Sequence, residues 1–173
     1  MNKQGEIDSG NVLLEQHEKL LARTVGGLQT DDEKSLSLIH RLVDDARDKA
    51  VRLKEVSMED AEKLAVYLKR DLTQAANYLS TTGSELKDWL GFDATLLETA
   101  FLEPLLEAAD PTTVELLALK EQAELAPCHS GQITTPGTLK CDKCGEKLHF
   151  YKSGKIPPCP RCHASNFHRS FRA

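Results

Sequence analysis

Cys141-Asp142-Lys143-Cys144-Gly145 and Cys159-Pro160-Arg161-Cys162 are two Cys-x-x-Cys pairs, with fourteen residues between the second and third cysteines. Two residues between cysteines allow a tight turn to aim both thiolates at one ion, and two such turns complete a tetrahedral zinc site. Gly145 suits the first turn, because the position after the second cysteine often needs a positive φ, which glycine adopts without strain. The spacing is typical of a zinc ribbon and predicts one Zn²⁺ bound by Cys141, Cys144, Cys159 and Cys162.

The predicted zinc is structural. Four thiolates close the coordination sphere and leave no position for water or substrate. A pair of disulfides or four free thiols are the alternatives, and both fit an intracellular chain poorly. The fifth cysteine, Cys128, is either a bystander thiol or a redox-sensitive or auxiliary ligand. His129 and His163 are further candidates to replace a cysteine, although four sulfurs already satisfy zinc.

The composition indicates long amphipathic helices and an uneven distribution of charge. Of the 173 residues, 28% are charged and only 5% are aromatic. From residue 128 onward the formal charge is +6, which leaves −11 for the preceding part of a chain whose net charge is −5. The start of the sequence shows no signal peptide, and no apolar run approaches the roughly 18–20 residues of a membrane span. We therefore expect a soluble, cytoplasmic protein.

The first 127 residues are expected to form a helical body. A helix should run from Asn11 to about the Gly26-Gly27 pair, because adjacent glycines are costly inside a helix. Residues 31–80 should form an antiparallel hairpin of two helices, the second capped by Ser57. Apolar residues recur in both arms at alternating intervals of three and four, which favours a coiled-coil seam; they are Leu36, Ile39, Val43, Ala46, Ala50 and Leu53, then Ala61, Ala65, Leu68, Leu72, Ala75 and Leu79. Further helices are expected over about 93–125.

The predicted fold is thus mainly α, with an α-helical body over 1–127 and a small β zinc ribbon over 128–173. Strands are predicted near 131–135, 138–141, 147–151 and 166–170, where the pattern shifts toward period two. Forty-six residues bury little apolar surface on their own, so the metal should supply much of the ribbon's stability.

Several motifs resemble the YbeL-like zinc-ribbon proteins of bacteria. They are the four cysteines, His129-Ser130-Gly131-Gln132, Phe167-His168-Arg169 and, upstream, Lys69-Arg70-Asp71-Leu72. The resemblance covers about residues 35–173 and implies the fold and the zinc site, but no activity. Two positions depart from the family pattern: Cys128 stands where relatives tend to have an aromatic residue, and His163 where they tend to have glycine. A left-handed histidine is tolerable at some cost.

Three functions remain open, and none of them is enzymatic. The first is an adaptor or regulator that presents the ribbon to a protein partner, with self-association through the helices also open. The second is a nucleic-acid binder that uses the basic ribbon, and the third is a redox sensor that releases zinc. Candidate contact residues are Lys147, Lys152, Lys155, Arg161, Arg169, Arg172, Phe150 and Tyr151. A lysine-rich surface without a ligand is the plain alternative to the second function.

The sequence can be searched for the motif of one specific kind of catalysis. Some transcript-cleavage factors resemble this ribbon fold and hold a catalytic Mg²⁺ with an adjacent Asp-Glu pair on the hairpin tip. In this chain Glu146 is the only acid between Gly145 and Pro158, so that motif is missing. We therefore predict that the protein is not an enzyme.

Overall fold

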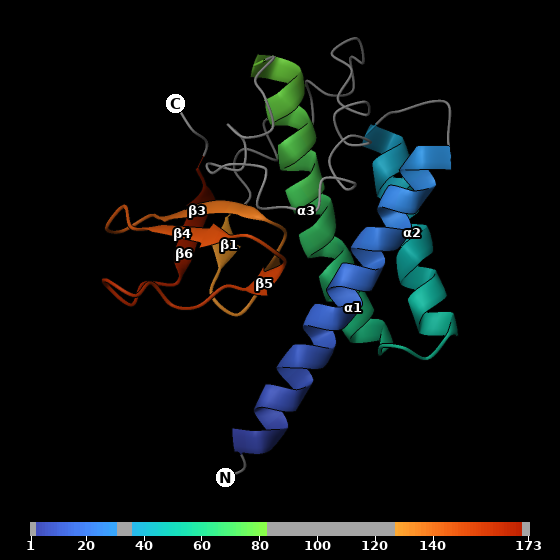
Figure 1. The fold of residues 1–173 in the computed structure, drawn as a ribbon, viewed down its shortest axis with the longest axis horizontal. Helices are drawn as coiled ribbons and strands as arrows, with labels where there is room; N and C mark the ends of the chain where they lie inside the picture. The colour runs from blue at the N-terminus through green and yellow to red at the C-terminus, as the bar shows by residue number, and fades with distance from the viewer. Residues whose placement is uncertain (1–2, 31–35, 83–126, 171–173) are drawn as a thin grey trace.

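The computed structural model describes residues 3–30, 36–82 and 127–170 as three helices followed by short antiparallel strands (Figure 1). The helices are α1 (Lys3–Thr30), α2 (Leu36–Arg52) and α3 (Met58–Thr82). The strands are β1 (Cys128–His129), β2 (Ile133–Thr134), β3 (Gly137–Cys141), β4 (Lys147–Phe150), β5 (Gly154–Lys155) and β6 (Asn166–Arg169). This part of the chain is a mixed fold with a C-terminal ribbon. The helices predicted over about 93–125 lie outside the described residues.

Helix α1 continues through the two glycines at which it was predicted to end. The reason is visible at Gly27, where an added Cβ would lie 2.5 Å from Cδ2 of Leu42 on α2. A glycine is used there because α1 and α2 approach each other closely. The helix then extends far enough to bury Leu28, which is only 1% exposed, and this packing offsets the poor helix propensity of the glycines.

The three helices share one apolar core. Of the predicted seam residues, Ile39, Val43 and Ala50 of α2 are fully buried, as are Ala61, Leu68 and Ala75 of α3. Leu20 and Leu28 of α1 join the same cluster, so the seam is covered by a third helix and does not form a two-helix coiled coil alone. Leu53 was wrongly assigned to the seam: it is 56% exposed, because α2 ends at Arg52.

A short connection turns the chain between α2 and α3. Lys54 has a φ of 56°, and the amides of Lys54 and Glu55 donate to the carbonyls of Val51 and Ala50. These are the hydrogen bonds of a Schellman motif, here with lysine in the left-handed position that glycine usually takes. Ser57 then caps α3 as predicted, because its hydroxyl oxygen accepts the amide of Asp60 at 3.1 Å.

The ribbon contains two antiparallel sheets. One has the strand order β1-β6-β3-β4, and the other is the two-stranded pair β2-β5. The predicted strands match β2, β3, β4 and β6, whereas β1 and β5 were missed because two residues show no period. The ribbon core consists of Cys128, Leu139, Cys141, Ile156, Cys159 and Phe167.

The ribbon is docked beside α3, as Figure 1 shows. Ile133 of β2 is 4% exposed and belongs to the apolar core of the helices rather than to that of the ribbon. The helices and the ribbon therefore share buried surface. None of the helices in the described ranges is long and apolar enough to cross a lipid bilayer.

Candidate metal centre

The two Cys-x-x-Cys pairs meet at the end of the ribbon. The Sγ atoms of Cys141, Cys144, Cys159 and Cys162 all lie within 4.8 Å of one another. Sulfur separations of 3.6 Å (Cys141–Cys162) and 3.5 Å (Cys144–Cys159) link the two pairs. Zn–S bonds of about 2.3 Å in a tetrahedron imply sulfur separations of about 3.8 Å. The site thus fits one zinc ion held by four thiolates, which makes the metal structural.

Each cysteine pair is held by the same kind of turn. The amide of Gly145 donates to the carbonyl of Cys141 at 2.9 Å, and the amide of His163 donates to the carbonyl of Cys159 at 2.8 Å. Gly145 and His163 both have positive φ, at 76° and 58°. The left-handed conformations expected at these two positions are therefore confirmed. Histidine adopts this conformation at some energetic cost, whereas Gly145 adopts it without strain.

When no metal is bound, the pKa values of two of these thiols, Cys144 and Cys159, are shifted in opposite directions. The backbone amide of Glu146 lowers the pKa of Cys144, but burial and hydrogen bonds with the other three thiols raise it to about 12. Burial raises the pKa of Cys159, while the amides of Cys162 and Arg161 and the neighbouring thiols lower it to about 7. Zinc binding must displace the remaining protons, so acid should release the metal.

Cys128 is a core residue, separate from the four clustered sulfurs. It is fully buried in β1, and its backbone lies opposite that of Phe167 in β6. Burial raises the pKa of its thiol, which favours the neutral, unreactive form.

The predicted contact residues of the ribbon differ in their exposure. Lys147, Lys152, Lys155 and Arg161 are exposed, and Tyr151 is 50% exposed. Phe150 is half-buried and packs against the ribbon core, which leaves its ring poorly placed for stacking on a ligand. Arg169 is buried, which leaves its side chain little surface for contact with a partner. Arg172 lies outside the described residues.

Arg169 is buried because it meets a carboxylate from the helical body. Asp71 on α3 is fully buried, and its Oδ2 lies 3.3 Å from Nη2 of Arg169. The same oxygen accepts the amide of Thr135 at 2.7 Å and the hydroxyl of Thr134 at 3.0 Å. The other oxygen accepts Nε–H of Arg70 at 2.9 Å. Asp71 is therefore the centre of a polar junction between α3 and the ribbon.

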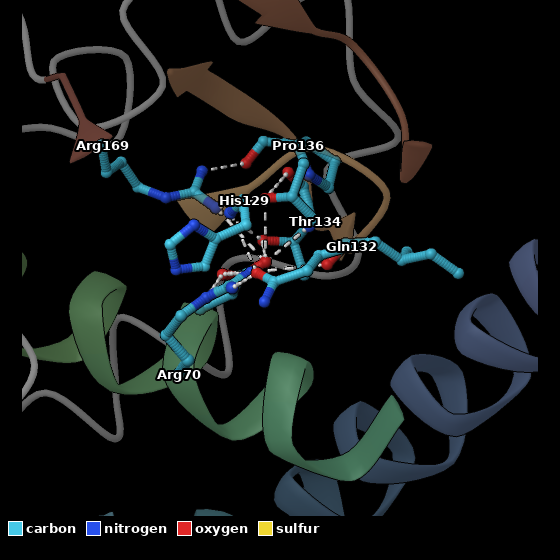
Figure 2. Close-up of polar contacts among 9 residues, drawn as sticks. Arg70, His129, Gln132, Thr134, Pro136 and Arg169 are labelled. Atoms are coloured by element: carbon cyan, nitrogen blue, oxygen red, sulfur yellow. Dashed lines mark hydrogen bonds and ion pairs between the residues drawn. The ribbon is translucent and has the colours of Figure 1, made fainter. Parts of the chain in front are cut away.

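Both arginines also donate to further groups of the ribbon besides Asp71 (Figure 2). Arg169 donates to the carbonyl of Pro136 at 3.0 Å and to the hydroxyl of Thr134 at 2.8 Å. Arg70 donates to Oε1 of Gln132 at 2.6 Å, and this oxygen also accepts the amide of His129. Burial raises the pKa of Asp71, but the two guanidinium groups outweigh burial and lower it to about 2. The junction thus holds a carboxylate and two cations together away from water.

The junction is the part of the molecule that sequence reasoning missed. Its charged members and Gln132 come from the three motifs that carried the family resemblance, namely the Lys69–Leu72, His129–Gln132 and Phe167–Arg169 stretches, whereas Thr134, Thr135 and Pro136 lie outside them. A signal was present, since Arg70 and Asp71 directly precede a buried leucine of the helix seam. A charged pair at that place is unusual unless it is paired across an interface.

The chain matches known proteins across both sides of this junction. Residues 27–171 match the family described as zinc-ribbon containing domain. The chain is 26% identical over 132 residues to the Uncharacterized protein YbeL of Escherichia coli strain K12 and to the proteins of that name in strains O6:H1 and O157:H7. These alignments cover 76% of this chain and 81% of each relative. No solved structure matches the chain. The resemblance inferred from the motifs is confirmed, and the chain belongs to the family of proteins with the zinc-ribbon containing domain.

Proposed function

We propose that the protein is a non-enzymatic adaptor or regulator that holds a zinc ribbon in a fixed pose on a helical support and presents it to a macromolecular partner. The observation that carries the proposal is the junction at Asp71. Three ribbon residues bind this one buried carboxylate: Arg169 through its guanidinium group, Thr134 through its hydroxyl, and Thr135 through both its amide and its hydroxyl. A ribbon joined to the helices only by its linker would not form so many buried polar contacts with them.

The metal site supports a binding role over a catalytic one. Four cysteine ligands leave no open coordination position at which a substrate or an activated water could bind. A reducing compartment such as the cytoplasm suits the chain, because the zinc site needs thiolates and Cys128 is a free thiol. The short α2–α3 connection and the shared core suit a rigid hairpin that acts as the support.

The fixed pose can be tested by releasing the ribbon without removing its zinc. Tagged wild-type protein, Asp71→Asn and the surface control Asp45→Asn are cross-linked in a native extract of the source cells and captured. Zinc per chain is measured for each. We expect one partner to be retained by the wild type and by Asp45→Asn, and to be lost from zinc-loaded Asp71→Asn. Equal recovery by all three, or no reproducible partner, would contradict the proposal.

A further inference from the structure

The four-stranded sheet of the ribbon has one face turned toward the helices and the ribbon core, and another turned away. Strand register places Leu139, Cys141, Phe167 and Arg169 on the inner face, where they are buried. The alternate residues lie on the opposite side, where all of them except the buried Thr138 are exposed or half-buried. We call this side the outer face; its members include His129, Lys140, Lys147, His149, Asn166 and His168.

Two lysines lie directly opposite each other on the outer face. Lys140 of β3 pairs in register with Lys147 of β4, and His168 of β6 completes the same row. Like charges placed opposite each other across strands destabilise a sheet. Within the described residues neither lysine forms an ion pair, whereas helix cations such as Lys63 and Lys69 bind carboxylates. The fold thus tolerates two uncompensated positive charges side by side.

Three imidazole rings lie on the same face of the sheet as these lysines, and each is oriented by a hydrogen bond at Nδ1. His149 bonds with the hydroxyl of Thr138 at 2.8 Å, and His129 bonds with Oδ1 of Asn166 at 3.1 Å. His168 bonds with Oδ1 of Asp142. Rings that are already held lose little conformational entropy when a ligand packs against them. The outer face therefore combines preoriented planar rings with unpaired cations.

We propose that the outer face binds single-stranded nucleic acid, an inference that rests on the proposed function and names its partner. Protein interfaces have apolar or aromatic centres and few lysines, whereas the outer face shows lysine, histidine and asparagine. Nucleic-acid interfaces are polar and positively charged. The phosphates contact Lys140 and Lys147, and unpaired bases stack on His149 and His168. A duplex hides the faces of its bases, so single strands are preferred.

The test measures fluorescence anisotropy of labelled strands of about 12 nucleotides, which spans common site sizes. Single-stranded RNA, single-stranded DNA and duplex DNA are compared at about 50 and 200 mM salt. Lys140→Gln/Lys147→Gln is compared with Lys152→Gln/Lys155→Gln, which removes two exposed lysines from the same ribbon but outside the outer face. Zinc per chain is measured for every protein. Lys147→Gln alone serves as a second variant, because Lys140 precedes a zinc ligand.

We expect the wild type to bind single strands more tightly than the duplex. The outer-face double variant should weaken binding by about tenfold or more at low salt and reduce the slope of log K against log salt by about 1.4, since each lost contact is worth about 0.7. The other double variant should change the slope much less. The RNA and DNA strands show which sugar is preferred.

Three results would overturn the inference: no binding of any strand, equal losses in the two double variants, or tighter binding of polyglutamate than of nucleic acid. If strands fail to bind while the cross-linked partner is still lost from Asp71→Asn, the inference fails and the proposed function stands. If strands bind as expected but Asp71→Asn binds them like the wild type, the fixed pose is the part that fails.

Discussion

The carboxylate of Asp71 is buried away from water, and the neighbouring arginines depend on its negative charge. In Asp71→Asn, the guanidinium groups of Arg70 and Arg169 stay buried without their carboxylate. Removing one member of a buried ionic cluster typically costs about 3–5 kcal/mol. We expect the free energy of unfolding in urea to fall by about that amount.

The control for this change is Asp45→Asn, because Asp45 is exposed on α2. Exposed substitutions of this kind usually change stability by less than about 0.5 kcal/mol. A loss below about 1 kcal/mol in Asp71→Asn would show that the junction is not a coupled cluster.

His17 should make the stability of the helical body depend on pH. It is fully buried on α1, and within the described residues neither ring nitrogen has a hydrogen-bond partner. Burial lowers its pKa from 6.5 to about 4, with smaller opposing effects of Asp71 and Arg70. Between pH 6.5 and about pH 4, His17 therefore binds a proton in the unfolded chain but not in the folded chain. Stability should fall across this window by about 3 kcal/mol in total.

The measurement is urea unfolding of His17→Leu and wild type between pH 7 and 4.5. Acid also releases zinc from both proteins, so the difference between them isolates the histidine. His17→Leu should be the more stable protein, and its advantage should grow as the pH falls. Gln16→Leu is the matched control: Gln16 is also buried, its oxygen has no hydrogen-bond partner in the described part of the chain, and it does not titrate. A constant difference between His17→Leu and wild type would refute the role of this side chain.

For single residues, the sequence predicted correctly those roles that depend on neighbours close in the chain. Cysteine spacing was enough to bring four sulfurs together, and the turn after each pair explains Gly145 and His163. It was not enough for Arg169, whose partner Asp71 lies on a helix in another part of the chain. Burial of an arginine depends on a tertiary contact. The local sequence pattern does not show which carboxylate provides that contact.

Among the elements, α1 offers a direct test of close helix packing. Gly26 and Gly27 are neighbours in the same helix, but an added methyl group meets nothing within 4 Å at Gly26 and meets Leu42 at 2.5 Å at Gly27. Gly26→Ala should stabilise the protein by up to about 1 kcal/mol through helix propensity alone. Gly27→Ala should gain less or lose stability, because Leu42 must move. Thermal unfolding of both variants decides this, and equal gains would show that the helices do not approach closely there.

The same site explains why the end of α1 was mispredicted. Glycine lowers helix propensity, so a pair of glycines predicts a stop unless another helix packs against it. In contrast, the capped start of α3 and the alternating pattern of β4 depend on nearby residues only, and both were predicted. Strands β1 and β5 exist because they pair with β6 and β2, and a two-residue pattern cannot reveal such a partner.

For the whole molecule, the junction should transmit zinc binding to the helices. Without metal the ribbon is expected to unfold, and α3 then loses Ile133 from its core together with Arg169 and the Thr135 amide from Asp71. Chelation should therefore remove hydrogen-exchange protection from residues 128–170 completely and from α3 in part. In Asp71→Asn the contacts are already weakened, so chelation should affect α3 less. Zinc removal and the Asp71→Asn substitution form a thermodynamic cycle, and we expect a coupling free energy between them of about 1–3 kcal/mol. If chelation changes protection of α3 equally in both proteins, the helices and the ribbon are adjacent but energetically independent.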